Sequence, residues 1–240
     1  MKLVAIGDIH GRTIWKDILE KEKPDIAVFM GDYFDSYDIE GREQIENFNN
    51  IVKFKEDNPC MEINMLYGNH EHHYMRSYEN YSGYQQKNAM SINMVLNFAR
   101  EKDYLRIAYL LDDLLFTHAG VSTEWLDKFV KYESLDTIAE DINELFHTDI
   151  GVFDFVGLSP TGDNVESSPL WIRHNSLLRS NRLKDIKKKY RQVIGHTPTK
   201  DLNLGVYKKY LGGRYIPIDT LNTGQYLIYE DKEMSVGKIL

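Results

Sequence analysis

Residues 2–11 read KLVAIGDIHG and place a short apolar run directly before a cluster of polar residues. The run from Lys2 to Ile6 is typical of a buried β-strand. It ends at Gly-Asp, and His10 follows Asp8 by two positions, so an extended or turning segment lets both side chains reach one ion. This segment therefore predicts a strand that delivers polar ligands at its carboxyl end.

The same arrangement of an apolar run followed by polar residues recurs along the chain. It is found at residues 25–30 before Asp32 and Asp35, at 62–67 before Asn69 and His70, at 114–117 before His118, and at 192–194 before His196. In open α/β sheets, ligands bind outside the carboxyl ends of the strands. The sequence therefore predicts one site at which carboxylates, imidazoles and an amide converge.

Segments with helical spacing separate these runs, and strands that alternate with helices predict an α/β fold. The predicted helices are Ile14–Glu22, the amphipathic Glu43–Lys55, Gln86–Lys102, Thr123–Lys131 and Leu135–His147. We expect a hairpin from residues 104–111 and 114–117, and a surface loop over 151–169 that is rich in Gly, Pro, Ser and Asp. The apolar runs 215–218, 226–230 and 234–239 predict a C-terminal β-meander.

The composition is that of an ordinary globular protein, with 240 residues, 42% hydrophobic and 28% charged. No repeat or linker divides the chain, so we expect a single domain over residues 1–240. The longest apolar runs are too short for a membrane span or a secretory signal. One cysteine, Cys60, excludes an internal disulfide, and these features together predict a cytoplasmic protein. A formal net charge of -8 argues against broad nucleic-acid binding.

The predicted cluster combines two carboxylates, three imidazoles and a side-chain amide. Such a set of oxygen and nitrogen ligands suits Mn, Fe, Zn or Mg rather than thiophilic metals. If two ions bind, Asp32 has to bridge them. Two ions about 3.5–4 Å apart activate a shared water and neutralise charge on a phosphoryl group. The pattern thus favours metal-assisted hydrolysis of a phosphate ester.

Five motifs resemble those of the calcineurin-like metallophosphoesterases in order and spacing: GDIHG (7–11), GDYFD (31–35), GNHE (68–71), THAG (117–120) and GHTP (195–198). The intact GNHE and the sequence PLWIR (169–173) are most similar to the phosphoprotein phosphatase branch, which includes short bacterial and phage-type serine/threonine phosphatases and symmetrical diadenosine tetraphosphatases. The resemblance implies a four-layer αββα sandwich with two mixed β-sheets. It also implies specificity loops and helices around residues 72–103 and 121–170.

The resemblance assigns a role to each motif residue. It implies two divalent ions, with Mn expected before Fe, Zn, Co or Mg. The implied ligands are Asp8 and His10 for the first ion, Asp32 as the bridge, and Asn69, His118 and His196 for the second ion. His70 resembles the general acid and Asp35 its partner. A metal-bridging hydroxide then attacks phosphorus in line, without a phosphoenzyme.

One departure from the family pattern affects the phosphate-binding residues. The family usually has Asp-Arg-Gly where this chain has Asp35-Ser36-Tyr37, so one phosphate-clamping arginine is replaced by Ser36. Arg173 of PLWIR is expected to clamp the phosphate, Asn69 is expected to bind the phosphate as well as a metal ion, and Arg12 is a candidate replacement for the lost arginine. His72 and His73 lie outside the family pattern and are expected to be solvated or to pack against loops.

The resemblance implies a phosphoric ester hydrolase acting on phosphate monoesters. The first hypothesis is a serine/threonine or broad-specificity phosphoprotein phosphatase. A nucleotide or nucleic-acid phosphoesterase, such as a dinucleoside tetraphosphatase or an end-processing phosphatase, is the alternative. A binding scaffold that kept the fold without the chemistry is the second alternative, because a fold alone does not fix a function. The expected partner is a phosphorylated protein or nucleotide, and no association with a membrane is expected.

Overall fold

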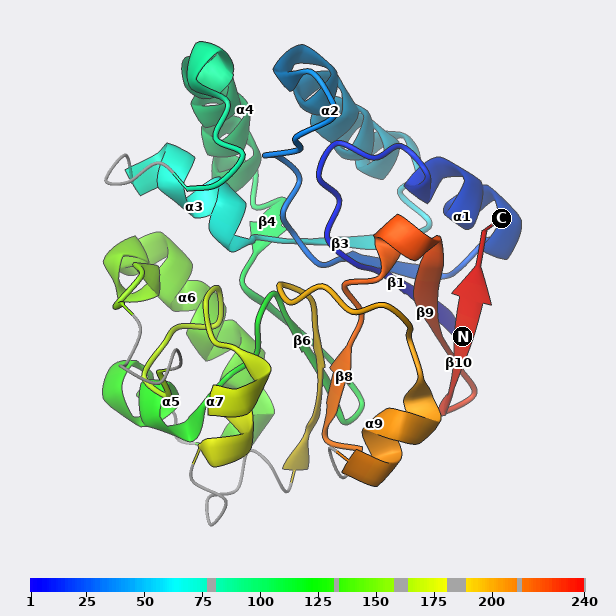
Figure 1. The fold of residues 1–240 in the computed structure, drawn as a ribbon, viewed down its shortest axis with the longest axis vertical. Helices are drawn as coiled ribbons and strands as arrows, with labels where there is room; N and C mark the ends of the chain where they lie inside the picture. Colours follow the sequence, from blue (N-terminus) through cyan, green and yellow to red (C-terminus); the bar gives the residue numbers. More distant parts are fainter. Residues whose placement is uncertain (77–80, 132–133, 158–163, 181–188, 211–212, 240) are drawn as a thin grey trace.

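The structure is a computed structural model that describes residues 1–76, 81–131, 134–157, 164–180, 189–210 and 213–239. The described residues form two β-sheets that face each other, with helices on both sides (Figure 1). This arrangement confirms the predicted α/β sandwich with two mixed sheets. The predicted loop over 151–169 lies partly outside the described residues.

The larger sheet has six strands in the order β10-β9-β1-β2-β3-β4. Its strands are β1 (Lys2–Ile6), β2 (Ile26–Phe29), β3 (Glu62–Leu66), β4 (Leu105–Arg106), β9 (Gln225–Glu230) and β10 (Glu233–Lys238). The pairs from β1 to β4 are parallel, whereas β9 runs antiparallel to both β1 and β10. The carboxyl ends of β1, β2 and β3 therefore lie at one edge of the sheet.

The smaller sheet has four strands in the order β5-β6-β7-β8. They are β5 (Ala108–Leu111), β6 (Leu114–Thr117), β7 (Arg191–Ile194) and β8 (Tyr215–Pro217). β5 and β6 form an antiparallel hairpin, while β6, β7 and β8 are parallel. The carboxyl ends of these three parallel strands supply the second half of the predicted site.

Helices cover the outer side of the six-stranded sheet and surround the four-stranded one (Figure 1). On the first side lie α1 (Trp15–Glu22), α2 (Gly41–Asp57), α3 (Asn69–Arg76) and α4 (Ala89–Glu101). Around the smaller sheet lie α5 (Thr123–Phe129), α6 (Ile138–Thr148), α7 (His174–Arg179) and α9 (Leu204–Tyr210). The short 3-10 turns are η1 (Gln86–Asn88), η2 (Leu135–Thr137), η3 (Ile150–Phe153) and η4 (Leu221–Thr223).

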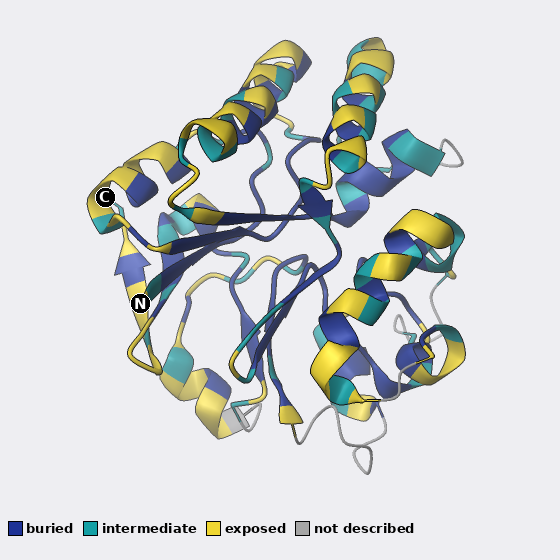
Figure 2. Cartoon of the chain, turned by 180° about the vertical axis from the view of Figure 1, so that it is seen from behind, coloured by how far each residue is buried: buried dark blue, intermediate teal, exposed yellow. Residues whose placement is uncertain are grey.

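The central strands are largely apolar because both of their faces are buried (Figure 2). In β1, Leu3 and Ala5 belong to the apolar cluster between the sheets, together with Phe116 of β6. The alternate residues Val4 and Ile6 belong to the cluster that includes the inner faces of the helices. Burial on two faces explains why these strands appear in the sequence as largely apolar runs.

Two predicted pairings are confirmed only in part. The hairpin forms between residues 108–111 and 114–117, but residues 105–106 of the run 104–111 form β4 of the larger sheet, on the other side of the buried Ile107. Of the predicted C-terminal meander, β9 and β10 pair with each other in the larger sheet, whereas β8 pairs with β7 in the smaller one. Apolar patterns locate strands, but they do not tell which sheet a strand joins.

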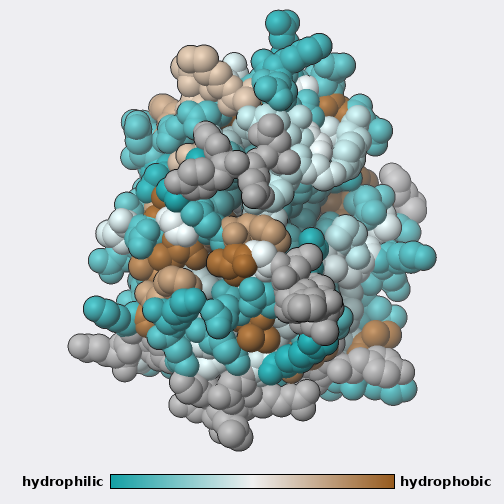
Figure 3. Space-filling view, turned by 60° about the vertical axis from the view of Figure 1, so that its left-hand side comes forward, coloured by the Kyte–Doolittle hydropathy of each residue, from teal (hydrophilic) through white to brown (hydrophobic). Residues whose placement is uncertain are grey.

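The surface shown in Figure 3 is mainly hydrophilic, with hydrophobic residues in patches between hydrophilic ones. Within the described residues, no helix is both long and apolar enough to cross a bilayer. Cys60 is an exposed free thiol. These observations agree with the globular composition.

Candidate metal centre

The predicted ligands come together where the carboxyl ends of the two sheets meet. Hydrogen bonds donated by backbone amides join the loops that follow the strands. The amide of His10 donates to the carbonyl of Asp32, and the amide of His196 donates to the Asp8 carboxylate at 3.0 Å. His10, Asp32 and His196 have φ angles of 43°, 50° and 63°, a left-handed conformation that is uncommon outside glycine. Such strain at several residues of one site is typical of a functional centre.

Two motif glycines allow the carboxylates to approach the neighbouring backbone. A Cβ atom on Gly68 would lie 2.2 Å from Asp32 Oδ1, and one on Gly195 would lie 2.2 Å from Asp8 Oδ1. Neither position has room for a side chain. The glycines of the GNHE and GHTP motifs are thus explained by close packing around the ligands.

The first group of candidate ligands consists of Asp8, His10 and Asp32, whose donor atoms all lie within 4.8 Å of one another. His10 Nδ1 lies 2.7 Å from the carbonyl oxygen of Phe34, so this nitrogen carries the proton and donates it. Nε2 then holds the lone pair and lies 3.9 Å from Asp32 Oδ2. A hydrogen bond donated by the second ring nitrogen, the one that does not bind the metal, is the usual support of a metal-binding histidine.

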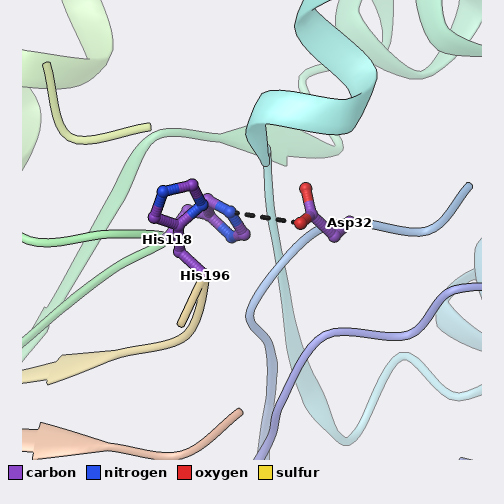
Figure 4. A group of neighbouring side chains, drawn as sticks. All are labelled: Asp32, His118 and His196. Carbon is purple, nitrogen blue, oxygen red and sulfur yellow. Dashed lines mark ion pairs between the residues drawn. The ribbon is translucent and has the colours of Figure 1, made fainter. Parts of the chain in front are cut away.

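The second group consists of Asp32, His118 and His196, again with donor atoms within 4.8 Å (Figure 4). The two imidazoles lie next to each other on the loops after β6 and β7 and face Asp32 (Figure 4). Asn69 Oδ1 lies 2.8 Å from His118 Nε2 and 2.7 Å from His196 Nδ1. Asp32 belongs to both groups, which is the position required of a bridging ligand.

The polarity of these atoms fits a cation. The carbonyl of Met30 accepts from His118 Nδ1 at 2.8 Å, so a neutral ring presents the lone pair of Nε2 to Asn69 Oδ1 and to Asp32 Oδ2. Acceptor atoms that face one another in this way need a positive charge between them: a bound cation, or in the ion-free site the proton that the raised pKa of His118 keeps on Nε2. His196 Nε2 is also buried and has no hydrogen-bond partner among the described residues. Carboxylate, amide and imidazole atoms are the ligands that Mn, Fe and Zn accept.

The protein groups alone have strongly perturbed pKa values. Burial opposes the ionisation of Asp32, but His118 and His70 hold its pKa well below the usual range. Burial likewise opposes protonation of His118, but the charge of Asp32 raises the pKa of His118 to about 9. Burial and the carboxylate of Asp219 raise the pKa of Asp8 well above the usual range. Clustered perturbations of this kind are typical of active sites.

The predicted acid and its partner lie beside the two ligand groups. His70 Nδ1 is 2.8 Å from Asp35 Oδ2, and the backbone amide of His70 donates to Asp32 Oδ1 at 3.0 Å. The imidazoles of His70 and His10 have centroids 5.2 Å apart. Burial opposes protonation of His70, but the carboxylates of Asp32 and Asp35 raise its pKa to about 9. The ring is therefore available as a proton donor near neutral pH.

The two candidate phosphate-binding arginines are held differently. Arg173 Nη1 donates to the carbonyl of His196 at 3.0 Å and to Thr197 Oγ1 at 3.3 Å, which places its guanidinium at the rim of the second ligand group. Arg12 Nη1 donates to the carbonyls of Asp8 and Ile9 at 3.4 and 3.3 Å. Arg12 also lines a cavity of about 720 Å³ beside η4. The phosphate-binding roles of both residues stay predictions.

Two further carboxylates at the site were not predicted. Glu71, within GNHE, is fully buried and accepts the backbone amides of Asp32, Tyr33 and Gly68 at 2.7–2.9 Å. Asp219 follows β8 and interacts with Asp8, and burial together with the charge of Asp32 raises the pKa of Asp219 to about 6. Asp219 has the same sequence signal as the ligands, an apolar run directly before an acidic residue.

Of the two expectations for His72 and His73, packing against loops is confirmed for both, because both are buried. His72 Nε2 lies 2.8 Å from Asp154 Oδ1 at the end of η3. The His73 ring stacks on Tyr81 with centroids 5.3 Å apart, and its Nε2 lies 2.8 Å from Asp35 Oδ2. Their neighbours come from distant parts of the chain, which a local sequence pattern does not reveal.

Comparison with known proteins identifies the class. The sequence model of the calcineurin-like phosphoesterases matches residues 1–217, and the chain belongs to this family of metal-dependent phosphoric ester hydrolases. The family implies divalent metal ions and a phosphorylated substrate, in agreement with the ligand groups described above. No curated protein sequence matches the chain significantly.

Solved structures share the fold at low sequence identity. A cold-active protein-tyrosine phosphatase from a psychrophilic Shewanella species is 20% identical with a TM-score of 0.65, covering 99% of this chain and 77% of its own. A protein serine/threonine phosphatase from Saccharomyces cerevisiae is 16% identical with a TM-score of 0.58, covering 100% and 79%. A metallophosphoesterase from Sphaerobacter thermophilus is 13% identical with a TM-score of 0.50, covering 100% and 89%.

Proposed function

We propose that this protein hydrolyses phosphate monoesters of proteins, with serine and threonine phosphates as its main substrates. The observation that carries the proposal is the His70–Asp35 pair, at 2.8 Å, directly beside two ligand groups that share Asp32. The ligand groups supply a place for the phosphoryl group. The pair supplies a proton for the group that leaves.

The residues present fit two divalent ions, of which Mn is our first choice. Asp8, His10 and Asp32 would hold one ion, and the other would be held by Asp32, Asn69, His118 and His196. When bound, the ions supply Lewis-acid activation of water and neutralise charge that develops on the phosphoryl oxygens. Arg173 would add a forked donor for those oxygens, at the rim where its Nη1 bonds to His196 and Thr197.

His70 acts in this proposal as the general acid. The Asp35 carboxylate accepts a hydrogen bond from the protonated Nδ1, and Nε2 carries the proton that is transferred to the leaving group. As the bond between phosphorus and the ester oxygen breaks, its electron pair stays on that oxygen, which takes the Nε2 proton. Positioned acids of this kind contribute typically 10²–10⁴-fold to a rate, roughly 3–5 kcal/mol.

The presence of an acid favours alcohol-type leaving groups. A serine or threonine alkoxide is a strong base and leaves slowly without a proton, whereas a polyphosphate leaves as a stable anion. A site with a buried and oriented acid is therefore better suited to phosphoserine and phosphothreonine than to dinucleoside polyphosphates. The formal charge of -8 also disfavours nucleic-acid substrates, which usually meet a basic surface. Of two neighbours in fold, one is named a protein-tyrosine phosphatase and the other a protein serine/threonine phosphatase; their names support a protein substrate, and the choice of serine and threonine rests on the acid.

The two predicted specificity segments meet beside the second ligand group. Tyr81 of the first segment and Phe155 of the second pack on Trp171, with ring centroids 4.7 and 4.9 Å away. Trp171 in turn lies 6.2 Å from the ring of His196. We propose that this aromatic wall helps to select the substrate, as the segments 72–103 and 121–170 approach the site there.

The proposal is tested with a substrate panel assayed in the presence of Mn²⁺. The panel contains phosphoserine, phosphothreonine and phosphotyrosine peptides, dinucleoside polyphosphates, cyclic nucleotides and 3′- or 5′-phosphorylated oligonucleotides. We expect the first two peptides to be hydrolysed fastest, and Asp32→Asn and His70→Asn to lose that activity. Faster hydrolysis of the nucleotides or oligonucleotides would identify a nucleotide or nucleic-acid phosphoesterase instead. No hydrolysis of any member would favour the binding scaffold.

A further inference from the structure

We propose that His73 and Tyr74 are positioning residues that orient the Asp35 carboxylate toward the acid His70. This inference rests on the proposed monoester hydrolysis and extends it beyond the His70–Asp35 pair. The Asp35 side chain is completely buried, and its two oxygens face three groups from one helix, α3. His70 Nδ1 and His73 Nε2 each lie 2.8 Å from Oδ2, and the Tyr74 hydroxyl donates to Oδ1.

The tautomer of His73 is set by the backbone that follows α3. The amide of Tyr81 donates to His73 Nδ1 at 3.4 Å, so this nitrogen holds the lone pair and Nε2 carries the proton. Nε2 faces Asp35 Oδ2, and the ring of Tyr81 stacks on the His73 ring with centroids 5.3 Å apart. The His73 ring is therefore held in a fixed orientation with Nε2 at 2.8 Å from Asp35 Oδ2, a close polar contact rather than a well-aligned hydrogen bond.

The Tyr74 hydroxyl is fixed in a similar way. It accepts the amide of Gln85 at 2.8 Å while it donates to Asp35 Oδ1. The ring of Tyr84 stacks on the Tyr74 ring with centroids 4.8 Å apart. Both groups that contact Asp35 are thus held in place by residues 81–85.

Residues 81–85 also cover the backbone at Asp35 and Ser36. A Cβ atom on Gly83 would lie 2.4 Å from the Asp35 carbonyl oxygen, and the Gln85 side chain donates to the carbonyl of Ser36 at 3.1 Å. Water is therefore kept from the carboxylate, and in a dry environment its hydrogen bonds are stronger and more directional. Burial opposes the ionisation of Asp35, but the interactions with His70 and His73 lower its pKa, so the group stays a carboxylate.

This arrangement has a consequence for the reaction. Asp35 Oδ1 accepts a hydrogen bond from Tyr74, and Oδ2 contacts both imidazoles. These contacts leave the Asp35 carboxylate one orientation, in which it accepts a hydrogen bond from His70 Nδ1. His70 then keeps its transferable proton on Nε2 and returns to this state after each turnover by taking a proton from water. Loss of either contact lets Asp35 rotate, and the acid is correctly oriented for a smaller fraction of the time.

The test compares a poor leaving group with a good one, because a positioned acid matters only for the poor one. The probes are a phosphoserine peptide and 4-nitrophenyl phosphate, assayed with the Mn²⁺-loaded enzyme. For Tyr74→Phe and His73→Gln we expect kcat on the phosphoserine peptide to fall roughly 10- to 100-fold, with less than about a threefold change on 4-nitrophenyl phosphate. His70→Asn removes the acid completely and gives the largest difference between the two substrates that its loss can cause.

Tyr104→Phe is the matched control, since it removes a tyrosine hydroxyl that also donates to a carboxylate, that of Glu56, away from Asp35. It should leave both rates near those of the wild type. Equal losses on both substrates, or a fall in bound Mn²⁺ in Tyr74→Phe, would overturn the inference, because the residues would then act through the fold or the ions. A third ion per chain that disappears in His73→Gln would also overturn it.

The outcome separates this inference from the proposed function. If the wild-type protein hydrolyses neither probe, the proposed function is wrong. If the wild type is active and only His70→Asn shows the leaving-group effect, the function stands and the roles of His73 and Tyr74 are wrong.

Discussion

Replacing Glu71 by glutamine tests how the site is built, because one buried carboxylate holds three backbone amides of the metal-binding loops. Glu71 Oε2 accepts the amides of Asp32 and Gly68, both at 2.9 Å, and Oε1 accepts the amide of Tyr33 at 2.7 Å. The side chain is fully buried, so water does not replace a lost bond. The substitution Glu71→Gln keeps the shape and removes one acceptor and the charge.

The expected cost follows from the bonds. In its best orientation the glutamine oxygen keeps the two bonds at the Oε2 position, and its NH₂ group then faces the amide of Tyr33. A buried donor without a partner costs about 1–3 kcal/mol, and loss of charge from the remaining bonds adds about 1 kcal/mol, so we expect about 2–4 kcal/mol less stability. The displaced loop also carries Asp32, and we expect Mn²⁺ affinity to fall roughly 10- to 100-fold.

The measurement is urea unfolding at pH 8 in a chelator, followed by calorimetric titration with Mn²⁺. Burial and the charge of Asp32 raise the pKa of Glu71 to about 7, so the carboxylate is mostly ionised at pH 8. Glu20→Gln, on the exposed face of α1, controls for the loss of one surface charge. Wild-type stability within about 0.5 kcal/mol together with unchanged Mn²⁺ affinity in Glu71→Gln would refute the reasoning, since that change is typical of a surface substitution.

Three further predictions follow from other parts of the structure. Arg173→Ala should lower kcat/KM about 10- to 100-fold through loss of charged bonds to phosphate, and Arg173→Lys should recover only part of it; equal rates would exclude the clamp. Burial lowers the pKa of His72 to about 4, so the unfolded chain takes up a proton below about pH 6.5 while the folded one does not. Stability should therefore fall by about 2 kcal/mol more between pH 7.5 and 5 in the wild type than in His72→Asn, as measured by urea unfolding, and identical slopes would contradict it. Gly83→Ala should cost at least about 2 kcal/mol more than Gly157→Ala, because both have a positive φ but only the first places a Cβ against backbone; equal unfolding midpoints would contradict this.

The ligands were predictable because the relevant signal is local. Each of Asp8, Asp32 and Asn69 is separated by one glycine from an apolar run that is buried in the sheet, and the carboxyl ends of parallel strands meet at one edge. The family resemblance then added the role of each residue. The structure brings His118 and His196 to the same place from the second sheet.

The features that the sequence did not predict depend on contacts between distant residues. Asp219 has the same local signal as the ligands, but its strand was assigned to a C-terminal meander, because nothing in an apolar run specifies the sheet it joins. His73 and Tyr74 lie on a helix, and their partner Asp35 is 38 and 39 positions away along the chain. Their burial becomes visible only when residues 81–85 close over Asp35.

The central claim is that two ligand groups share Asp32, and the most direct test is the amount of Mn²⁺ retained per chain after loading and desalting. We predict about two ions for the wild type, about one for His196→Asn, and less than one for Asp32→Asn, because only Asp32 belongs to both groups. If Asp32→Asn retained as many ions as the wild type, a shared carboxylate at this site would be contradicted.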